Sequence, residues 1–84
     1  MRKASDVFKD IGVNFVTEEP VAYGWINDDL AYEIATGRGI FGEPVWGVSV
    51  RSKSNPKVSH DASMMVADRG AADEYVALLK EEYT

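Results

Sequence analysis

The chain has 84 residues, 45% of them hydrophobic and 27% charged, a balance typical of one small globular domain spanning residues 1–84. Its formal net charge of −5 argues against general binding to DNA or RNA, because that binding depends on Lys and Arg neutralising phosphates. The absence of cysteine excludes disulfides, thiolate metal ligands and a Cys nucleophile. With no apolar leader or membrane-length segment in view, we expect a cytoplasmic protein that does not enter a membrane.

The first elements predicted along the chain are a short helix and two strands. Residues 5–11 begin with Ser5 as a capping residue, carry apolar side chains on one face, and are followed by a glycine. Residues 13–17 are expected to form a short strand that the Glu-Glu-Pro sequence at 18–20 stops. Over 21–26, large and small side chains alternate, which predicts a second strand.

Residues 30–36 fit two interpretations. Leu30, Tyr32 and Ile34 are in phase for a strand, whereas Asp28 could cap a helix over the same residues. We prefer the strand because the segment that follows is a natural antiparallel partner for it.

The clearest strand covers residues 45–51, where large apolar side chains occupy one side and small or polar ones the other. A polar, basic connection over 52–57 contains an Asn-Pro turn signal. Another strand is expected over 62–66. Met64 and Met65 in it could adapt to the surface of a partner, but we expect Met64 to fill core space.

The last element is a helix that begins after the N-cap residue Asp68. Its core-facing stripe is formed by Ala72, Tyr75, Val76 and Leu79. We place Asp73 and Glu74 in its first turn, where acids suit the helix dipole. The elements together predict an α+β fold: a small antiparallel sheet of three to five strands with a C-terminal helix packed on one face and a short N-terminal helix.

Three glycines have the spacing of a phosphate-binding loop: Gly37, Gly39 and Gly42. A dinucleotide-binding loop leads into a helix, but here a strand follows. We therefore expect an eight-residue hairpin connection over 37–44, and a small ligand or nucleotide binder using this loop is kept as an alternative.

The centre of that connection is Ile40-Phe41, two large apolar residues between glycines. They could protrude as a hydrophobic tip with Arg38 and Glu43 at its base, and such apolar anchors often dominate protein interfaces. They could equally fold back and bury Phe41 over the end of the sheet, since a domain of this size uses most of its aromatic residues in the core.

Four aromatic side chains could form a stacking platform for bases, aided by the basic stretch 51–57: Tyr23, Trp25, Tyr32 and Trp46. We prefer to place them in the core beneath the C-terminal helix, because they are in phase with apolar neighbours.

Polar candidates for chemistry are few. His60 is the only histidine and has no partners at metal-ligand spacing, so we expect it at the surface or at a strand edge. Asn27, Asp28 and Asp29 supply too few oxygens for a cation site and are expected to form a polar turn. We predict no metal, no cofactor and no catalytic residues.

These observations favour a small acidic binding module over an enzyme: a regulatory or inhibitory protein that contacts another protein. Its size and charge are similar to those of phage-type inhibitors such as anti-CRISPR proteins, by analogy alone. The expected contact residues are Arg38, Ile40, Phe41, Glu43, Asp28 and Asp29. The main alternative is a symmetric oligomer, such as a homodimer, with a site between chains. Nucleic acid is not an expected partner.

Overall fold

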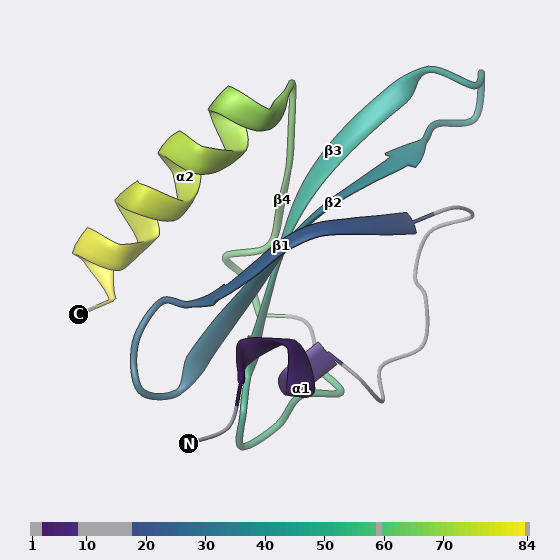
Figure 1. Ribbon diagram of the computed structural model, residues 1–84. Coiled ribbons are helices and arrows are strands. Elements are labelled where there is room, and N and C mark those ends of the chain that lie inside the picture. The colour runs from purple at the N-terminus through teal and green to yellow at the C-terminus, as the bar shows by residue number, and fades with distance from the viewer. Residues whose placement is uncertain (1–2, 9–17, 59, 84) are drawn as a thin grey trace.

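The computed structural model describes residues 3–8, 18–58 and 60–83 (Figure 1). Its elements are α1 (Ala4–Phe8), β1 (Glu18–Trp25), β2 (Leu30–Arg38), β3 (Pro44–Ser52), β4 (Met64–Val66) and α2 (Arg69–Glu82). The strands form one antiparallel sheet in the order β1-β2-β3-β4, so that β1 and β4 are its edges. The predicted α+β fold is confirmed: a short helix is the first element of the chain, a longer helix is the last, and an antiparallel sheet lies between them in sequence.

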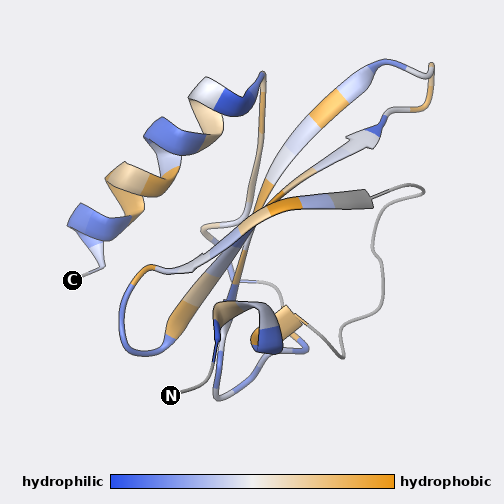
Figure 2. Ribbon diagram, viewed as in Figure 1, coloured by the Kyte–Doolittle hydropathy of each residue, from blue (hydrophilic) through white to orange (hydrophobic). Residues whose placement is uncertain are grey.

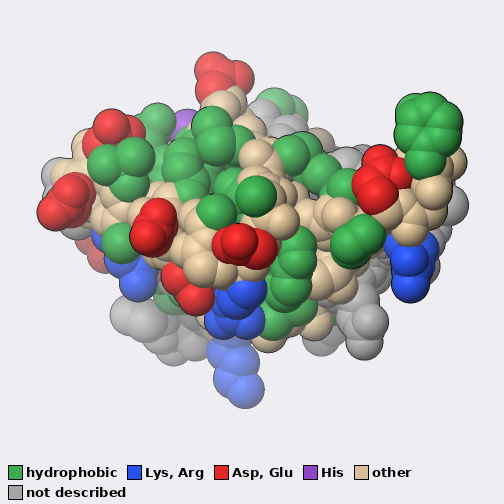
Figure 3. All heavy atoms as spheres, turned by 90° about the horizontal axis from the view of Figure 1, so that it is seen from above, with side chains coloured by type: hydrophobic (Ala, Val, Ile, Leu, Met, Phe, Trp, Pro, Cys, Tyr) green, Lys and Arg blue, Asp and Glu red, His purple; other side chains and the backbone are tan. Residues whose placement is uncertain are grey.

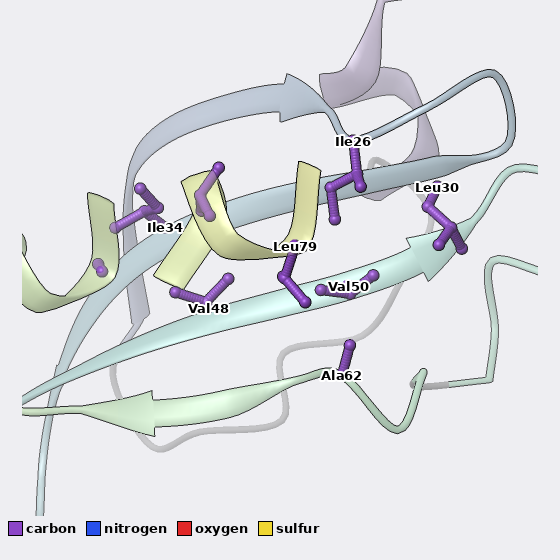
Figure 4. Packing of buried hydrophobic residues seen from close by; sticks show 9 residues of the cluster. Ile26, Leu30, Ile34, Val48, Val50, Ala62 and Leu79 are labelled. Carbon is purple, nitrogen blue, oxygen red and sulfur yellow. The ribbon is translucent and has the colours of Figure 1, made fainter. Parts of the chain in front are cut away.

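The main core lies between α2 and one face of the sheet. Hydrophobic and hydrophilic residues alternate along α2 and along the strands, so each element turns one side toward the core (Figure 2). The side chains of this core interlock between the helix and the two central strands (Figure 4). The cluster comprises Ile26, Leu30, Ile34, Val48, Val50, Ala62, Ala72, Val76 and Leu79. Burying each of the larger ones contributes about 1.5–3 kcal/mol.

The start of α2 is fixed by Asp68, as predicted. Its carboxylate accepts a hydrogen bond of 2.8 Å from the backbone N–H of Ala71, which satisfies one of the unpaired donors of the first turn. The prediction that Asp73 and Glu74 lie in the first turn is wrong, because the helix begins at Arg69 and they fall in the second.

The opposite face of the sheet is covered in part by α1. Ala4 and Val7 are buried against Ala31 of β2, and Trp25 of β1 packs beside them. The residues on this face alternate along each strand with those that face α2, because successive side chains of a strand point to opposite sides.

The four aromatic residues are divided between the two faces, so neither the shared platform nor a single core beneath α2 is correct. Trp25 lies opposite Ala31 and packs with α1, whereas Tyr32 and Trp46 pack against the α2 core. Tyr23 lies on the same face of the sheet as α1, where its ring centroid is 5.7 Å from that of Phe8. The β1–β2 register explains this division, because it pairs Tyr23 with Glu33 and Trp25 with Ala31. Glu33 and Ala31 flank Tyr32 in β2, so their side chains point to the opposite face of the sheet from its ring.

Two strand predictions are confirmed and one boundary is wrong. Residues 30–36 are strand, not helix, within β2, and 45–51 lie within β3. Residues 18–20, which were expected to interrupt the chain between two strands, are themselves strand residues at the start of β1. Pro20 is tolerated because β1 is an edge strand with a bulge between Pro20 and Ala22. The strand predicted over 13–17, and the predicted helix beyond Phe8, lie outside the described residues.

Strand β4 is shorter than predicted, at three residues, and its Met64 side chain is 50% exposed instead of filling the core. The cause is position in the sheet: β4 is the outermost strand, and α2 packs over the strands inside it. Of the predicted 62–66 segment, Ala62 alone is fully part of the core.

Candidate functional site

The hairpin between β2 and β3 is tighter than the eight-residue connection predicted. Strand β2 continues to Arg38 and β3 begins at Pro44. Gly39 N–H donates to the Glu43 carbonyl at 2.9 Å, and Gly42 N–H donates to the Gly39 carbonyl at 3.0 Å. Gly42 has φ of 81°, the left-handed conformation. This is the arrangement of a three-residue hairpin loop ending in a left-handed glycine.

The tip of this hairpin protrudes, which resolves the two interpretations that the sequence left open. Ile40 is 95% exposed and Phe41 is 93% exposed. The hairpin extends past the rest of the sheet (Figure 1), and hydrophobic residues lie at its turn (Figure 2). In the space-filling view, hydrophobic side chains stand out from the same end of the molecule (Figure 3). Phe41 therefore contributes almost nothing to the core.

Arg38 and Glu43, which the sequence placed at the base of the tip, hold the loop in shape. Arg38 Nη1 donates to the Gly42 carbonyl at 2.9 Å, and Glu43 Oε2 accepts from Phe41 N–H at 3.0 Å. The Glu43 carboxylate lies so close over Gly39 that a Cβ there would be 1.8 Å from Glu43 Oε1. The two charged side chains thus limit the conformations through which the tip can be presented.

We expect Gly42→Ala to lower the free energy of unfolding by about 1–2 kcal/mol, the cost of a left-handed conformation for a residue with a Cβ. Space is not the reason, because nothing lies within 4 Å of a Cβ built at Gly42. Urea denaturation measures the loss. The control is Gly70→Ala inside α2, where the change should raise stability or leave it unaltered. A loss of the same size in both variants would refute the backbone explanation.

The loop geometry does not favour phosphate binding. A phosphate-binding loop offers several free backbone N–H groups. Here the N–H groups of Gly39, Phe41 and Gly42 all donate within the loop, and the Glu43 carboxylate occupies the position beside them. An anion would meet a negative charge and few available donors, so the nucleotide alternative gains no support from this hairpin.

The two aspartates predicted as contacts lie at the other end of β2. Asn27 Oδ1 accepts from the backbone N–H groups of Asp29 and Leu30, both at 2.8 Å, which confirms the polar turn. Asp28 is exposed in this turn. The nine residues of β2 separate the turn from the hairpin tip by about 30 Å, so the structure does not bring the six predicted contact residues into one site.

Asp29 holds the turn after β3 in place. Its carboxylate accepts hydrogen bonds from the hydroxyls of Ser52 at 2.6 Å and Ser54 at 3.2 Å, and its carbonyl accepts from Lys53 N–H at 2.8 Å. The hydrogen bond from Ser52 lowers the pKa of Asp29; burial acts in the opposite direction, and Ser54 and the charge of Lys53 add to the lowering. This carboxylate is committed to structure.

The lowered pKa predicts an acid-dependent part of the stability. Because the pKa of Asp29 is lower in the folded chain than its unfolded value of about 3.9, the stabilisation is complete above roughly pH 5 and is lost as pH falls through the folded pKa. The difference in free energy of unfolding between the unaltered protein and Asp29→Asn should therefore be constant near neutrality and shrink in acid. A difference that stays constant to about pH 2 would contradict this assignment.

Two other polar residues are structural. His60, half-buried in the turn before β4, accepts from Ala62 N–H through Nδ1 at 3.0 Å, and its ring meets Tyr83 edge-on at 5.6 Å. Arg51, the first residue of the predicted basic stretch, is only 4% exposed and donates through Nη1 to the Pro56 carbonyl at 3.2 Å. Its guanidinium is thus not available to a phosphate backbone.

Leu78 is a surface residue that the sequence interpretation did not identify, and Met64 is one that it placed in the core. Met64, Met65 and Leu78 are each about half exposed although all three are large and apolar. The signal for Leu78 was available, because it falls outside the stripe that faces the core. The exposure of the two methionines depends on which strand ends the sheet, and no local pattern encodes that.

Within residues 3–8, 18–58 and 60–83, no three His, Asp or Glu side chains converge as metal ligands. No helix in the described part of the chain combines the length and apolar character that crossing a bilayer requires. Comparisons with protein-family models, with curated proteins and with solved structures find no match to this chain.

Proposed function

We propose that this protein is a small non-enzymatic regulatory or inhibitory module that acts in the cytoplasm by inserting its hairpin tip, Ile40 and Phe41, into an apolar pocket of another protein. The observation that carries the proposal is the nearly complete exposure of both side chains. Inhibitors of the phage type, such as anti-CRISPR proteins, are examples of the class of protein that we propose, by analogy of size and charge alone.

The energetics favour such a contact. Transferring an exposed Phe side chain into an apolar pocket contributes about 1.5–3 kcal/mol, and residues of this kind commonly carry most of the affinity of an interface. The tip is already ordered by the hydrogen bonds of Arg38 and Glu43, so little conformational entropy is lost when it docks. The net charge of −5 would speed encounter with a basic surface around that pocket.

Site-specific photocrosslinking tests the proposal. A photoreactive phenylalanine analogue is placed at Phe41 in one sample and at Val58, another exposed apolar residue, in a matched control. In the lysate of the organism that carries the gene, we expect a discrete adduct with a different protein from position 41 and none from position 58. An adduct with a second copy of the chain would favour the oligomer alternative, and equal adduct patterns from the two positions would refute the role of the tip.

A further inference from the structure

A second apolar surface lies where one flank of α2 meets the edge strand β4. Met64 and Leu78 are 50% and 48% exposed. The Tyr75 hydroxyl donates to the Ala62 carbonyl, which places this flank of the helix against the segment that enters β4. Leu78 follows Tyr75 by three residues and therefore lies on the same flank, one turn further along. We call this surface the α2–β4 seam, defined by Met64, Glu74, Tyr75, Leu78 and Glu82.

The charges on this flank of α2 are all negative. Glu74 and Glu82 lie four residues before and after Leu78, so the three side chains follow one another along the helix surface. Burial of the hydroxyl, together with the negative charges of Tyr83 and Glu82, raises the pKa of Tyr75. Glu82 follows Tyr75 by seven residues, two helical turns, so helical spacing puts both on the flank that carries Leu78.

The basic residues of α2 lie on its other flank. Arg69 Nε forms an ion pair of 3.2 Å with Asp73, and Lys80 Nζ lies 5.8 Å from the ring centre of Tyr32, which belongs to β2. Arg69 and Lys80, the basic residues of α2, therefore lie away from the flank that carries Glu74 and Glu82. Figure 3 shows acidic side chains interspersed with hydrophobic ones on this side of the molecule.

We propose that the α2–β4 seam binds a basic amphipathic helix of a partner protein. The apolar stripe of that helix would pack on Met64 and Leu78, and its Lys or Arg side chains would lie beside Glu74 and Glu82. Methionine suits this role because its flexible, polarisable side chain adapts to different apolar surfaces. A helix with an apolar stripe bordered by basic residues is complementary to this surface in both hydrophobicity and charge.

A designed peptide tests the proposal without a known partner. It has 14 residues, the length of α2, and consists only of leucine and lysine at helical spacing. In a titration followed by ¹⁵N NMR, we expect saturable shifts in the amides of 62–66 and 71–82. Leu78→Ala should weaken binding about tenfold, as expected for the loss of one partly buried apolar contact.

The charge requirement is tested by a matched pair of variants on the same helix. Glu82→Lys and Asp73→Lys change the net charge equally, but only Glu82 lies in the seam. We expect Glu82→Lys to weaken peptide binding about tenfold and Asp73→Lys to change it less than about threefold. Equal losses of affinity in the two variants would show general electrostatic attraction. Equally tight binding of a peptide with glutamate in place of lysine would show apolar adhesion. Either result overturns the proposal.

Two further results would also overturn the proposal. One is the absence of saturable binding at millimolar peptide. The other is a dimer in light scattering that Leu78→Ala converts to a monomer, because the occupant of the seam would then be a second copy of the chain.

The proposal is independent of the hairpin tip. Phe41→Ala should leave the peptide affinity unchanged, so a failure at one surface is distinguishable from a failure at the other.

Discussion

Replacing Phe41 with Ala is expected to weaken partner binding by about 30-fold or more, equivalent to about 2 kcal/mol, while the free energy of unfolding changes by less than about 0.5 kcal/mol. The separation follows from the position of the ring, which is 93% exposed and packs on nothing that the fold depends on. Urea denaturation measures the stability, and titration against the protein captured by crosslinking measures the affinity.

Ile40→Ala serves as the companion variant, because Ile40 is exposed to the same degree on the same loop. It should also weaken binding and spare stability. Loss of several kcal/mol of stability in Phe41→Ala with intact binding would mean that the ring is part of the core, as a buried Phe typically costs about 3–5 kcal/mol when truncated. That outcome would remove the tip from the interface.

Truncating Leu79 to Ala is expected to destabilise the fold by about 2–5 kcal/mol, whereas the same change at the neighbouring Leu78 should cost less than about 1 kcal/mol. Leu79 is 2% exposed in the α2 core, while Leu78 is 48% exposed on the seam. A chain of this length has a total stability of roughly 4–13 kcal/mol, so Leu79→Ala removes a large share of it.

The pair of leucines is a strict test of how α2 is rotated about its axis, since both variants delete the same atoms from adjacent positions. Thermal or urea unfolding of the two proteins gives the comparison directly. Equal losses, or a larger loss at Leu78, would contradict the packing of α2 described above.

The elements with strong local signals were predictable from the sequence. Helix α2 has an N-cap residue and a stripe of core side chains at helical spacing, and both are local properties of residues 68–79. Strand β3 alternates cleanly, and the choice of strand for 30–36 was correct because β3 is its direct neighbour.

Properties that depend on contacts between distant segments were not predictable. The division of the aromatic rings between two faces follows from the β1–β2 register, in which Gly24 lies opposite Tyr32. A Cβ at Gly24 would be 2.5 Å from the Tyr32 ring, so the glycine makes room for it. The exposure of Met64 follows from the position of β4 at the sheet edge. Neither the division of the aromatic rings nor the exposure of Met64 can be derived from the spacing of hydrophobic residues along the sequence.

The candidate site was predictable in part. The residues of the tip were identified, but their exposure was undecided because it depends on whether the loop returns to the sheet. The Glu43 carboxylate, which accepts from Phe41 N–H, and the left-handed Gly42 hold the turn in its extended form. Asp28 and Asp29, also predicted as contact residues, lie at the opposite end of β2 from the tip, and this separation follows from the nine-residue length of the strand.

The most direct test of the tip as a binding element is ¹⁹F NMR of the protein labelled with 4-fluorophenylalanine. The chain has three phenylalanines, so three signals are expected, and Phe41→Ala identifies the relevant one. In the isolated protein, this signal should show the large H₂O-to-D₂O shift of a solvated ring, and it should shift or broaden when the captured partner is added. A signal that shows no solvent isotope shift, or that is unaffected by the partner, would contradict the account.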